Sequence, residues 1–252
     1  MTRPLAGWRV IVPRGGEWGE RVAADLRAHG AIPTIAPLIN FAPAADTEVL
    51  AQALERLAQG AYDWVIVTSA TTVDVFQAMR AVIHPDTNVA AVGETTAAAL
   101  QAAGYRCDFV PTNESSAIGL LTELPLAESG GQRILLPQSE IADSSLARDF
   151  QAAGHSAEQV TAYRTIGVAA PDSVVEAVAA GVFRAILVTS GSVALQVEEQ
   201  FRDIPEQTLI VAIGPRTAHD ALALGLPVDL IARERSSMSL VETLVEAARE
   251  NQ

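Results

Sequence analysis

Short apolar runs alternate with amphipathic stretches along the whole chain. Runs such as Trp64–Thr68 and Ala185–Thr189 are apolar almost throughout, which is typical of parallel strands buried on both faces. Between the runs, apolar residues recur at helical spacing, as at Val22, Ala23 and Leu26. This alternation predicts an α/β fold with parallel sheets flanked by helices.

The pattern predicts helices at Glu17–His29 and Leu240–Glu250, among others. The expected strands are Arg9–Arg14, Ile32–Pro37, Trp64–Thr68, Asn88–Val92, Arg106–Val110, Arg133–Pro137, Ala157–Ala162, Ala185–Thr189, Leu209–Ile213 and Val228–Ile231.

The second half of the chain repeats landmarks of the first, which predicts an internal duplication. Five pairs lie 121 positions apart: Thr68-Ser69 and Thr189-Ser190, Gly93 and Gly214, Thr96 and Thr217, Gly104 and Gly225, Ser115-Ser116 and Ser236-Ser237. Two earlier pairs lie 124 apart: Arg9–Arg14 and Arg133–Gln138, Gly30-Ala31 and Gly154-His155. A three-residue deletion in a surface loop accounts for the change of offset.

Two segments at nearly equivalent places in the copies are expected to be links between domains. Pro37–Pro43 is held extended by its prolines, and Tyr163–Pro171 lies close to the matching place in the second copy.

Composition excludes several function classes. The 252 residues suit one or two domains and carry a net charge of −13, which argues against nucleic acid or anionic membrane as a partner. All 17 basic residues are arginine, so Schiff-base and P-loop lysine chemistry are ruled out. The single cysteine, Cys107, cannot form an internal disulfide. No apolar run could span a membrane and Met1–Val12 resembles no secretory signal, so a cytoplasmic location is expected.

Small hydroxyl residues follow two apolar strands, at Thr68-Ser69-Ala70-Thr71 and at Thr189-Ser190-Gly191-Ser192. Capping of the following helix explains one such motif. Two at repeat-related positions also fit binding, since open α/β sheets bind ligands at the carboxyl ends of their strands. No G-x-S-x-G elbow surrounds either serine, which argues against a serine nucleophile.

Three further edges could contact an anion. Arg14 and two glycines stand where a strand meets a helix, either as a plain turn or as N–H donors. At Gly93 and Gly214 we expect the glycine to let the chain turn and Thr96 or Thr217 to cap the next helix. Arg216 supplies a fork for a carboxylate, or is a surface arginine without a partner.

Tyr163 stands at the second expected link, where a phenol could face a cleft and exchange a proton. The alternative is a half-buried packing tyrosine. The four histidines have no metal-ligand spacing, so no metal site is predicted.

Taken together, these motifs resemble the uroporphyrinogen-III synthase family over nearly the whole chain. The matching pieces are Gly7–Arg14, Gly30-Ala31, Pro37–Ile39, Asp63–Ser69, Val92-Gly93 with Thr96-Ala97, Gly104, Tyr163–Thr165, Val188–Ser190, Ile213–Ala218 and Gly225–Val228.

The resemblance implies two α/β domains joined by a two-stranded link, with the copies exchanging their first strand–helix–strand pieces. The first domain would be residues 1–37 plus 168–252, the second 38–167, with links near 37–43 and 163–171. It also implies a monomeric enzyme of tetrapyrrole synthesis with no cofactor. Its small-molecule substrate would be hydroxymethylbilane, a linear tetrapyrrole with eight carboxylates, closed to uroporphyrinogen III through a spiro intermediate that inverts the terminal ring.

By position, Tyr163 matches the family's tyrosine, proposed to assist loss of the substrate hydroxyl. The same resemblance, together with the position of these residues at sheet edges, assigns substrate-binding roles to twelve residues. They are Arg14, Thr68, Ser69, Ala70, Gly93, Thr96, Ser139, Ser190, Gly191, Ser192, Arg216 and Thr217. Two positions depart from the family: Gln138-Ser139-Glu140 where Arg-Gly-Glu is frequent, and Arg216 where a small hydroxyl residue is common.

Other function classes compete with the synthase. Two α/β domains with two links also suit a non-catalytic binding or sensor module for an anionic small molecule. A nucleotide-dependent enzyme is disfavoured, since neither phosphate-binding fingerprint is present.

Overall fold

The structure is a computed structural model that describes residues 3–112, 117–126 and 131–250. The chain forms two compact units: unit 1 comprises residues 1–40 and 166–252, and unit 2 comprises residues 41–165. The repeat landmark Ser115-Ser116 lies outside the described residues.

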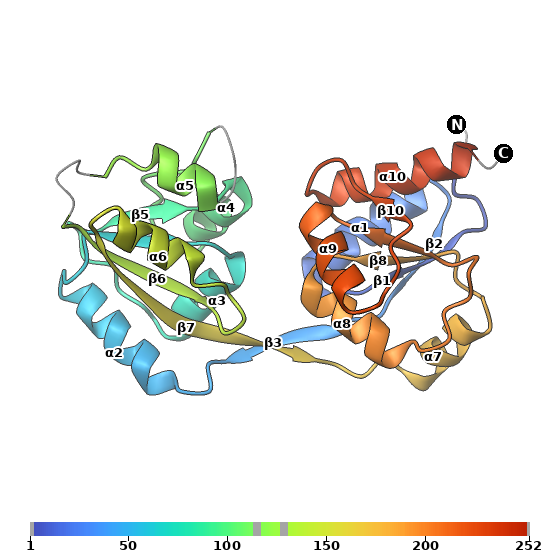
Figure 1. The fold of residues 1–252 in the computed structure, drawn as a ribbon, viewed down its shortest axis with the longest axis horizontal. Helices are drawn as coiled ribbons and strands as arrows, with labels where there is room; N and C mark the ends of the chain where they lie inside the picture. The colour runs from blue at the N-terminus through green and yellow to red at the C-terminus, as the bar shows by residue number, and fades with distance from the viewer. Residues whose placement is uncertain (1–2, 113–116, 127–130, 251–252) are drawn as a thin grey trace. The chain divides into compact units, whose positions relative to one another are not determined.

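Unit 1 contains a sheet of strand order β10-β9-β8-β1-β2, flanked by helices (Figure 1). Its elements are β1 (Arg9–Val12), α1 (Gly16–Ala28), β2 (Ile32–Ile35), α7 (Asp172–Ala179), β8 (Ala185–Val188), α8 (Gly191–Gln200), β9 (Leu209–Ala212), α9 (Pro215–Ala223), β10 (Leu230–Ile231) and α10 (Ser237–Glu250).

Unit 2 contains the second sheet, of order β3-β7-β6-β4-β5. Its elements are α2 (Thr47–Ala58), β4 (Trp64–Val67), α3 (Ala70–Ala78), β5 (Asn88–Ala91), α4 (Glu94–Ala102), α5 (Ala117–Glu123), β6 (Arg133–Ser139) and α6 (Ser145–Ala152). The chain passes between the units through β3 (Ile39–Pro43) and β7 (Ser156–Gly167), which are hydrogen-bonded neighbours.

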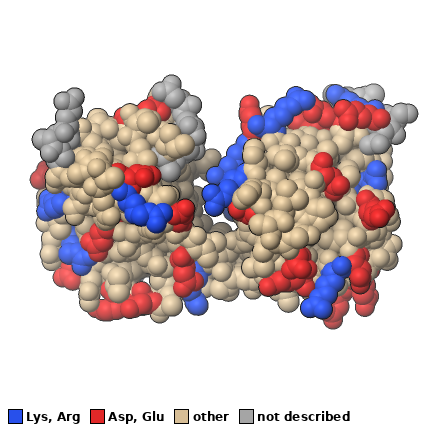
Figure 2. All heavy atoms as spheres, viewed as in Figure 1, with Lys and Arg blue, Asp and Glu red and all other residues tan. Residues whose placement is uncertain are grey.

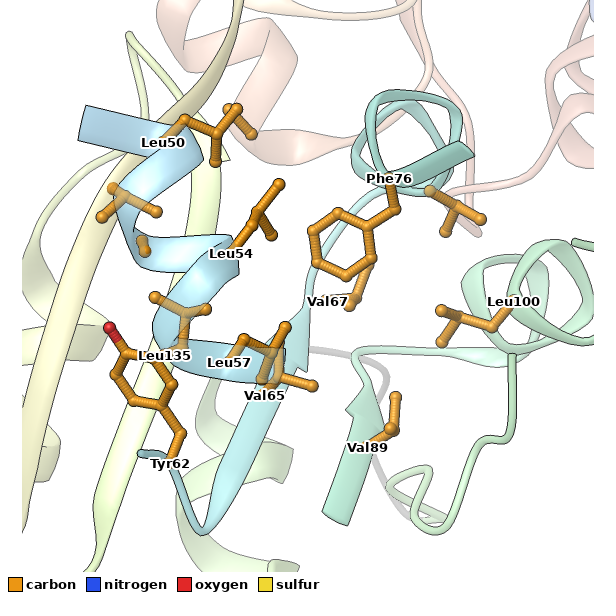
Figure 3. Packing of buried hydrophobic residues seen from close by; sticks show 14 of the residues in the cluster. Leu50, Leu54, Leu57, Tyr62, Val65, Val67, Phe76, Val89, Leu100 and Leu135 are labelled. Atoms are coloured by element: carbon orange, nitrogen blue, oxygen red, sulfur yellow. The ribbon is translucent and has the colours of Figure 1, made fainter. Parts of the chain in front are cut away.

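Each sheet is buried on both faces, as its apolar strands predict. In unit 1, α1 and α10 pack on one face and α7, α8 and α9 on the other. In unit 2, α5 and α6 cover one face. The other face packs against α2, α3 and α4 around Phe76, Leu57 and Leu135 (Figure 3). The predicted α/β fold class is confirmed, and the neighbouring strands β1–β2, β1–β8, β8–β9, β6–β7 and β4–β5 all pair in parallel.

The duplication is visible as one strand order used twice. β1 and β2 correspond to β6 and β7, while β8 and β9 correspond to β4 and β5. The order β2-β1-β8-β9 in unit 1 therefore matches β7-β6-β4-β5 in unit 2. Each unit combines the first strand–helix–strand piece of one copy with the remainder of the other, so the copies have exchanged these pieces.

Side chains repeat as faithfully as strands. Buried Thr87 donates its hydroxyl to Tyr62 O at 2.7 Å, and Thr208, 121 positions later, donates to Phe183 O at 2.8 Å. The Asp108 carboxylate accepts from Val89 N at 2.8 Å, and that of Asp229 accepts from Ile210 N at 2.7 Å.

The predicted strand Arg106–Val110 is wrong, and Val228–Ile231 shrinks to β10. Only an isolated bridge joins Ala90 and Phe109. The Asp108 side chain takes the Val89 N–H, as Asp229 takes the Ile210 N–H just before β10, so backbone pairing can begin only after each aspartate.

Among the described residues no helix is both long and apolar enough to cross a membrane. On the face shown in Figure 2, acidic and basic side chains are interspersed over both units.

Candidate functional site

The carboxyl edge of the unit 2 sheet carries Tyr163. In register, Tyr163 lies opposite Ser139, the last residue of β6, after a bulge that leaves Ala162 without a partner on that strand. Successive residues of a regular strand face opposite sides, yet Ala162 and Tyr163 both pack into the cluster of α2, α3 and α4. The bulge therefore turns Tyr163 onto that face, and only 8% of the residue stays exposed.

The Tyr163 hydroxyl meets the start of α3. It donates to Ser69 Oγ at 3.2 Å, and Ser69 Oγ also accepts from the Thr71 N–H at 3.1 Å. The Phe41 ring contacts the Tyr163 ring edge to face, with centroids 5.4 Å apart. Ser69 is thus the N-cap of α3, as predicted, and joins the phenol to the positive end of that helix.

Tyr163 differs from the two other tyrosines of the chain. Burial, with a hydrogen bond to Glu158, raises the pKa of Tyr62 to about 12, and burial raises the pKa of Tyr105. The Tyr62 hydroxyl donates to Glu158 at 2.7 Å, and that of Tyr105 donates to Ala81 O at 3.1 Å. Both phenols are occupied with structural partners away from the sheet edge.

The remaining residues predicted on unit 2 lie at the same edge. Thr68 follows β4, and Ala70 is the first residue of α3. Gly93 is the N-cap of α4, with φ −174°, so the prediction that Thr96 caps this helix is wrong. Thr96 lies inside the first turn and is buried. Gly93 has extended backbone that any residue adopts, so the expected glycine-dependent turn is absent at this helix start.

Ser139 ends β6, and its Oγ is buried, as is Oε1 of the preceding Gln138. Among residues 3–112, 117–126 and 131–250 neither oxygen has a hydrogen-bond partner. Buried polar atoms normally have partners, so this strand end is under-satisfied within the described residues.

In unit 1, Ser190 caps α8 by accepting from the Val193 N–H at 3.2 Å. Gly191 and Ser192 begin that helix. A Cβ on Gly191 would lie 3.0 Å from Asp220 Oδ2 and 3.2 Å from Asp220 Cβ, so a larger residue would require the Asp220 side chain to shift. Thr189 Oγ1, just before the cap, is buried and has no hydrogen-bond partner in the part of the chain that the structure describes.

Arg216 is not without a partner. Its Nε lies 3.0 Å from Asp220 Oδ1 across one turn of α9, while most of its side chain stays exposed. Gly214, with φ 176°, is the N-cap of α9, so Thr217 is a buried residue of the first turn and not the predicted cap. The Arg14 guanidinium stacks over the Trp18 ring at 5.0 Å.

The predicted residues therefore form two sets, one at the carboxyl edge of each sheet. Unit 2 brings together Thr68, Ser69, Ala70, Gly93, Thr96, Ser139 and Tyr163, and unit 1 holds Arg14, Ser190, Gly191, Ser192, Arg216 and Thr217. Sequence reasoning missed two participants, Phe41 and Asp220, and named Thr71 only as part of the hydroxyl motif. Asp220 had a signal, four residues after Arg216 on one helix; the Phe41 contact had none.

No group of three or more His, Cys, Asp or Glu side chains is placed to hold a metal ion in the described ranges.

Comparison with known proteins agrees with the resemblance. The family model for uroporphyrinogen-III synthase HemD matches residues 20–242. The porphyrin biosynthesis protein HemD of Ruminiclostridium josui is 27% identical over 256 residues, which cover 98% of this chain and 50% of that protein. The uroporphyrinogen-III synthase of Synechococcus elongatus is 29% identical over 169 residues, 65% of this chain and 62% of that protein. The chain thus spans about half the length of the first relative and less than two thirds of the second.

Solved structures show the same fold. A mutant uroporphyrinogen III synthase of Thermus thermophilus matches with a TM-score of 0.62 at 19% identity, over 97% of this chain and 100% of that one. The uroporphyrinogen-III synthetase of Helicobacter pylori 26695 matches with a TM-score of 0.63 at 17% identity, over 95% and 99% of the two chains.

Proposed function

The chain belongs to the uroporphyrinogen-III synthase family, and from this membership we propose that it closes hydroxymethylbilane to uroporphyrinogen III. In this reaction the terminal ring of the linear tetrapyrrole is inverted through a spiro intermediate, and one water is released. The observation that carries the proposal is a phenol at the carboxyl edge of a parallel sheet, where open α/β sheets place their ligands.

Tyr163 is the proposed general acid. The carbon–oxygen bond of the substrate's hydroxymethyl group breaks with its electron pair going to oxygen, and the Tyr163 proton goes to that oxygen, giving water. The substituted carbon of the terminal ring forms the spiro intermediate, which fragments, and the unsubstituted α-carbon of that ring then closes the macrocycle and loses its proton, which restores the phenol. The two proton transfers balance, so the step needs no redox cofactor, and general acid catalysis of this kind contributes ~10²–10⁴-fold.

The proposed substrate contacts are hydrogen-bond donors and arginines. The starts of α3, α4, α8 and α9 lie beside Thr68, Ser190 and neighbouring residues, and the serines that cap α3 and α8 each accept one N–H. N–H groups at helix starts favour carboxylates, and Arg216 and Arg14 add fixed charge. Together these groups suit a polycarboxylate without any lysine.

The test is a product analysis. Freshly generated hydroxymethylbilane is supplied to the purified protein without added cofactor, and the uroporphyrin isomers are separated after oxidation. We expect an excess of isomer III over the protein-free control. Isomer I alone, formed at the spontaneous rate, would overturn the proposal; if the protein then still bound the tetrapyrrole tightly, the sensor module would replace the synthase.

A further inference from the structure

Ser69 makes a hydrogen bond with the Tyr163 hydroxyl that capping of α3 does not require. We propose that Ser69 is a positioning residue that holds the Tyr163 hydroxyl and supports it after proton transfer, instead of serving as a substrate contact. This inference rests on the proposed synthase function and concerns how the acid of that reaction is held.

The hydrogen-bond capacity of Ser69 is taken up inside the protein. A serine hydroxyl has two acceptor lone pairs and one proton to donate. Both acceptor sites are filled, by the Thr71 N–H at 3.1 Å and by the Tyr163 O–H at 3.2 Å. No acceptor site is left for a substrate donor, while the Ser69 proton stays available to an acceptor beside it.

The repeat supplies an internal reference for this arrangement. Ser190 is the equivalent N-cap of α8, and it accepts from the N–H of the third helical residue, Val193. Ser69 instead accepts from the second helical residue, Thr71. The position equivalent to Tyr163 in unit 1 is Ile39, which has no hydroxyl. Either N–H partner is ordinary at a cap, as Asp46 shows by accepting from both at the start of α2, so the feature that sets Ser69 apart from Ser190 is the phenol that donates to it.

Three features hold the phenol at this place. The bulge in β7 directs Tyr163 toward α3, the Phe41 ring packs edge to face on it, and the residue is 8% exposed. A side chain packed in this way loses little further freedom on reaching its reactive position, which favours turnover.

The pair also has a role after the proton has left. Once Tyr163 has given its proton to the departing oxygen, the phenolate needs a donor. Ser69 can turn its O–H to the phenolate while it keeps the Thr71 N–H, which places the new negative charge one hydroxyl away from the positive end of α3. The proton released on ring closure then returns to Tyr163, and Ser69 again becomes the acceptor.

The first arm of the test probes the hydrogen bond between Tyr163 and Ser69 in the absence of substrate. The chain has three tyrosines, so protein labelled at tyrosine ¹³Cζ gives three resonances, and Tyr163→Phe assigns one of them. We expect Ser69→Ala to shift the Tyr163 resonance alone and Ser69→Thr to restore it. Ser190→Ala is the matched control: it removes an equivalent helix cap, and it should leave all three resonances in place. An unmoved Tyr163 resonance in Ser69→Ala overturns the proposal.

The second arm is kinetic. We expect Ser69→Ala to lower kcat about tenfold, as for loss of a hydrogen bond to a developing charge, with KM changed less than twofold. Ser69→Thr should recover most of kcat. A raised KM with unchanged kcat would make Ser69 a substrate contact and overturn the proposal. Failure of the synthase function itself is a separate result, because wild-type protein would then yield isomer I alone.

Discussion

Unit 1 and unit 2 place the same threonine and the same aspartate at matching points of their sheets, yet all three tyrosines of the chain stand in unit 2. At the amino ends of the strands the units share these threonine and aspartate contacts. At the carboxyl edges they differ: unit 2 has the Tyr163–Ser69 pair, and unit 1 has Ile39 and the Arg216–Asp220 ion pair.

The comparison separates what the fold requires from what the reaction requires. Contacts found in both units hold a frame that works with either set of edge residues. Contacts found in one unit only are the candidates for chemistry, and each has a counterpart that serves as its control.

The largest expected difference is in the core. Phe76 is fully buried in unit 2, and Val197 is its counterpart in unit 1. Phe76→Ala should lower the free energy of unfolding by about 3–5 kcal/mol, and Val197→Ala by about 2 kcal/mol, because the second change removes fewer atoms. Amide hydrogen exchange resolved by unit measures both. Equal losses for the two variants would show that the cost does not follow side-chain size, and hence that the two cores are not packed alike.

The next effect is on turnover. Tyr163→Phe should lower kcat about 10²-fold while KM stays within a factor of two, since the phenol is proposed to act in the transition state. Ile39→Val alters the counterpart in unit 1 and should leave kcat unchanged within a factor of two. Isomer-resolved kinetics measure both variants. An unchanged kcat in Tyr163→Phe would show that Tyr163 is not the general acid.

A smaller effect concerns the paired aspartates. Asp108→Ala and Asp229→Ala each leave a backbone N–H without its acceptor, which should cost about 1–2 kcal/mol. Asp108→Ala should cost a few tenths more, because Asp108 also pairs with Arg106 at 3.1 Å, whereas Pro227 stands at the matching place in unit 1. Urea unfolding measures these free energies. Asp108→Asn and Asp229→Asn keep an acceptor oxygen and serve as milder controls. If either alanine variant unfolded at the wild-type urea concentration, the two aspartates would not share the proposed stabilising role.

The smallest effect depends on pH. The hydrogen bond from Arg133 holds the pKa of Asp63 below its ordinary value; the two side chains lie 3.0 Å apart. The resulting stability is present above the ordinary aspartate pKa and is lost as pH falls from about 4 through the lowered value.

Because the Asp63 side chain is partly exposed, the loss should be under about 1 kcal/mol. Unit 1 has Arg9 and Arg184 at the matching positions and cannot show it. Amide hydrogen exchange measured while the pH is lowered should therefore show a larger loss of stability in unit 2 than in unit 1. Asp63→Asn should abolish that contribution, and an unaltered pH response in the variant would contradict it.

The fold was predictable from sequence because its signals are local and doubled. Apolar runs such as Val65-Ile66-Val67 mark buried parallel strands, and the constant offset of 121 showed that they occur twice. The strand expected at Arg106–Val110 failed because apolar residues there do not reveal that the Asp108 side chain would occupy the ladder.

The site was predictable only in part. Ser69 and Ser190 were recognised as caps because the cap is a local interaction. Thr96 and Thr217 were wrongly expected to cap, since the preceding glycines take that place. The Tyr163–Ser69 contact joins residues 94 positions apart and depends on a bulge. No local sequence pattern predicts this bulge, so the orientation of Tyr163 could be established only from the structure.

The exchanged strand–helix–strand pieces also set an order of events during synthesis. Unit 2 is one continuous stretch, whereas β1 must pair with β8, which lies about 175 residues later in the chain. At ~5–20 residues per second the ribosome needs roughly 9–35 s to make that stretch. β1 can pair with β2 as soon as both are made, whereas its other edge has no partner until β8 follows. Until then the open edge of the apolar β1 depends on transient contacts or chaperones to stay out of aggregates.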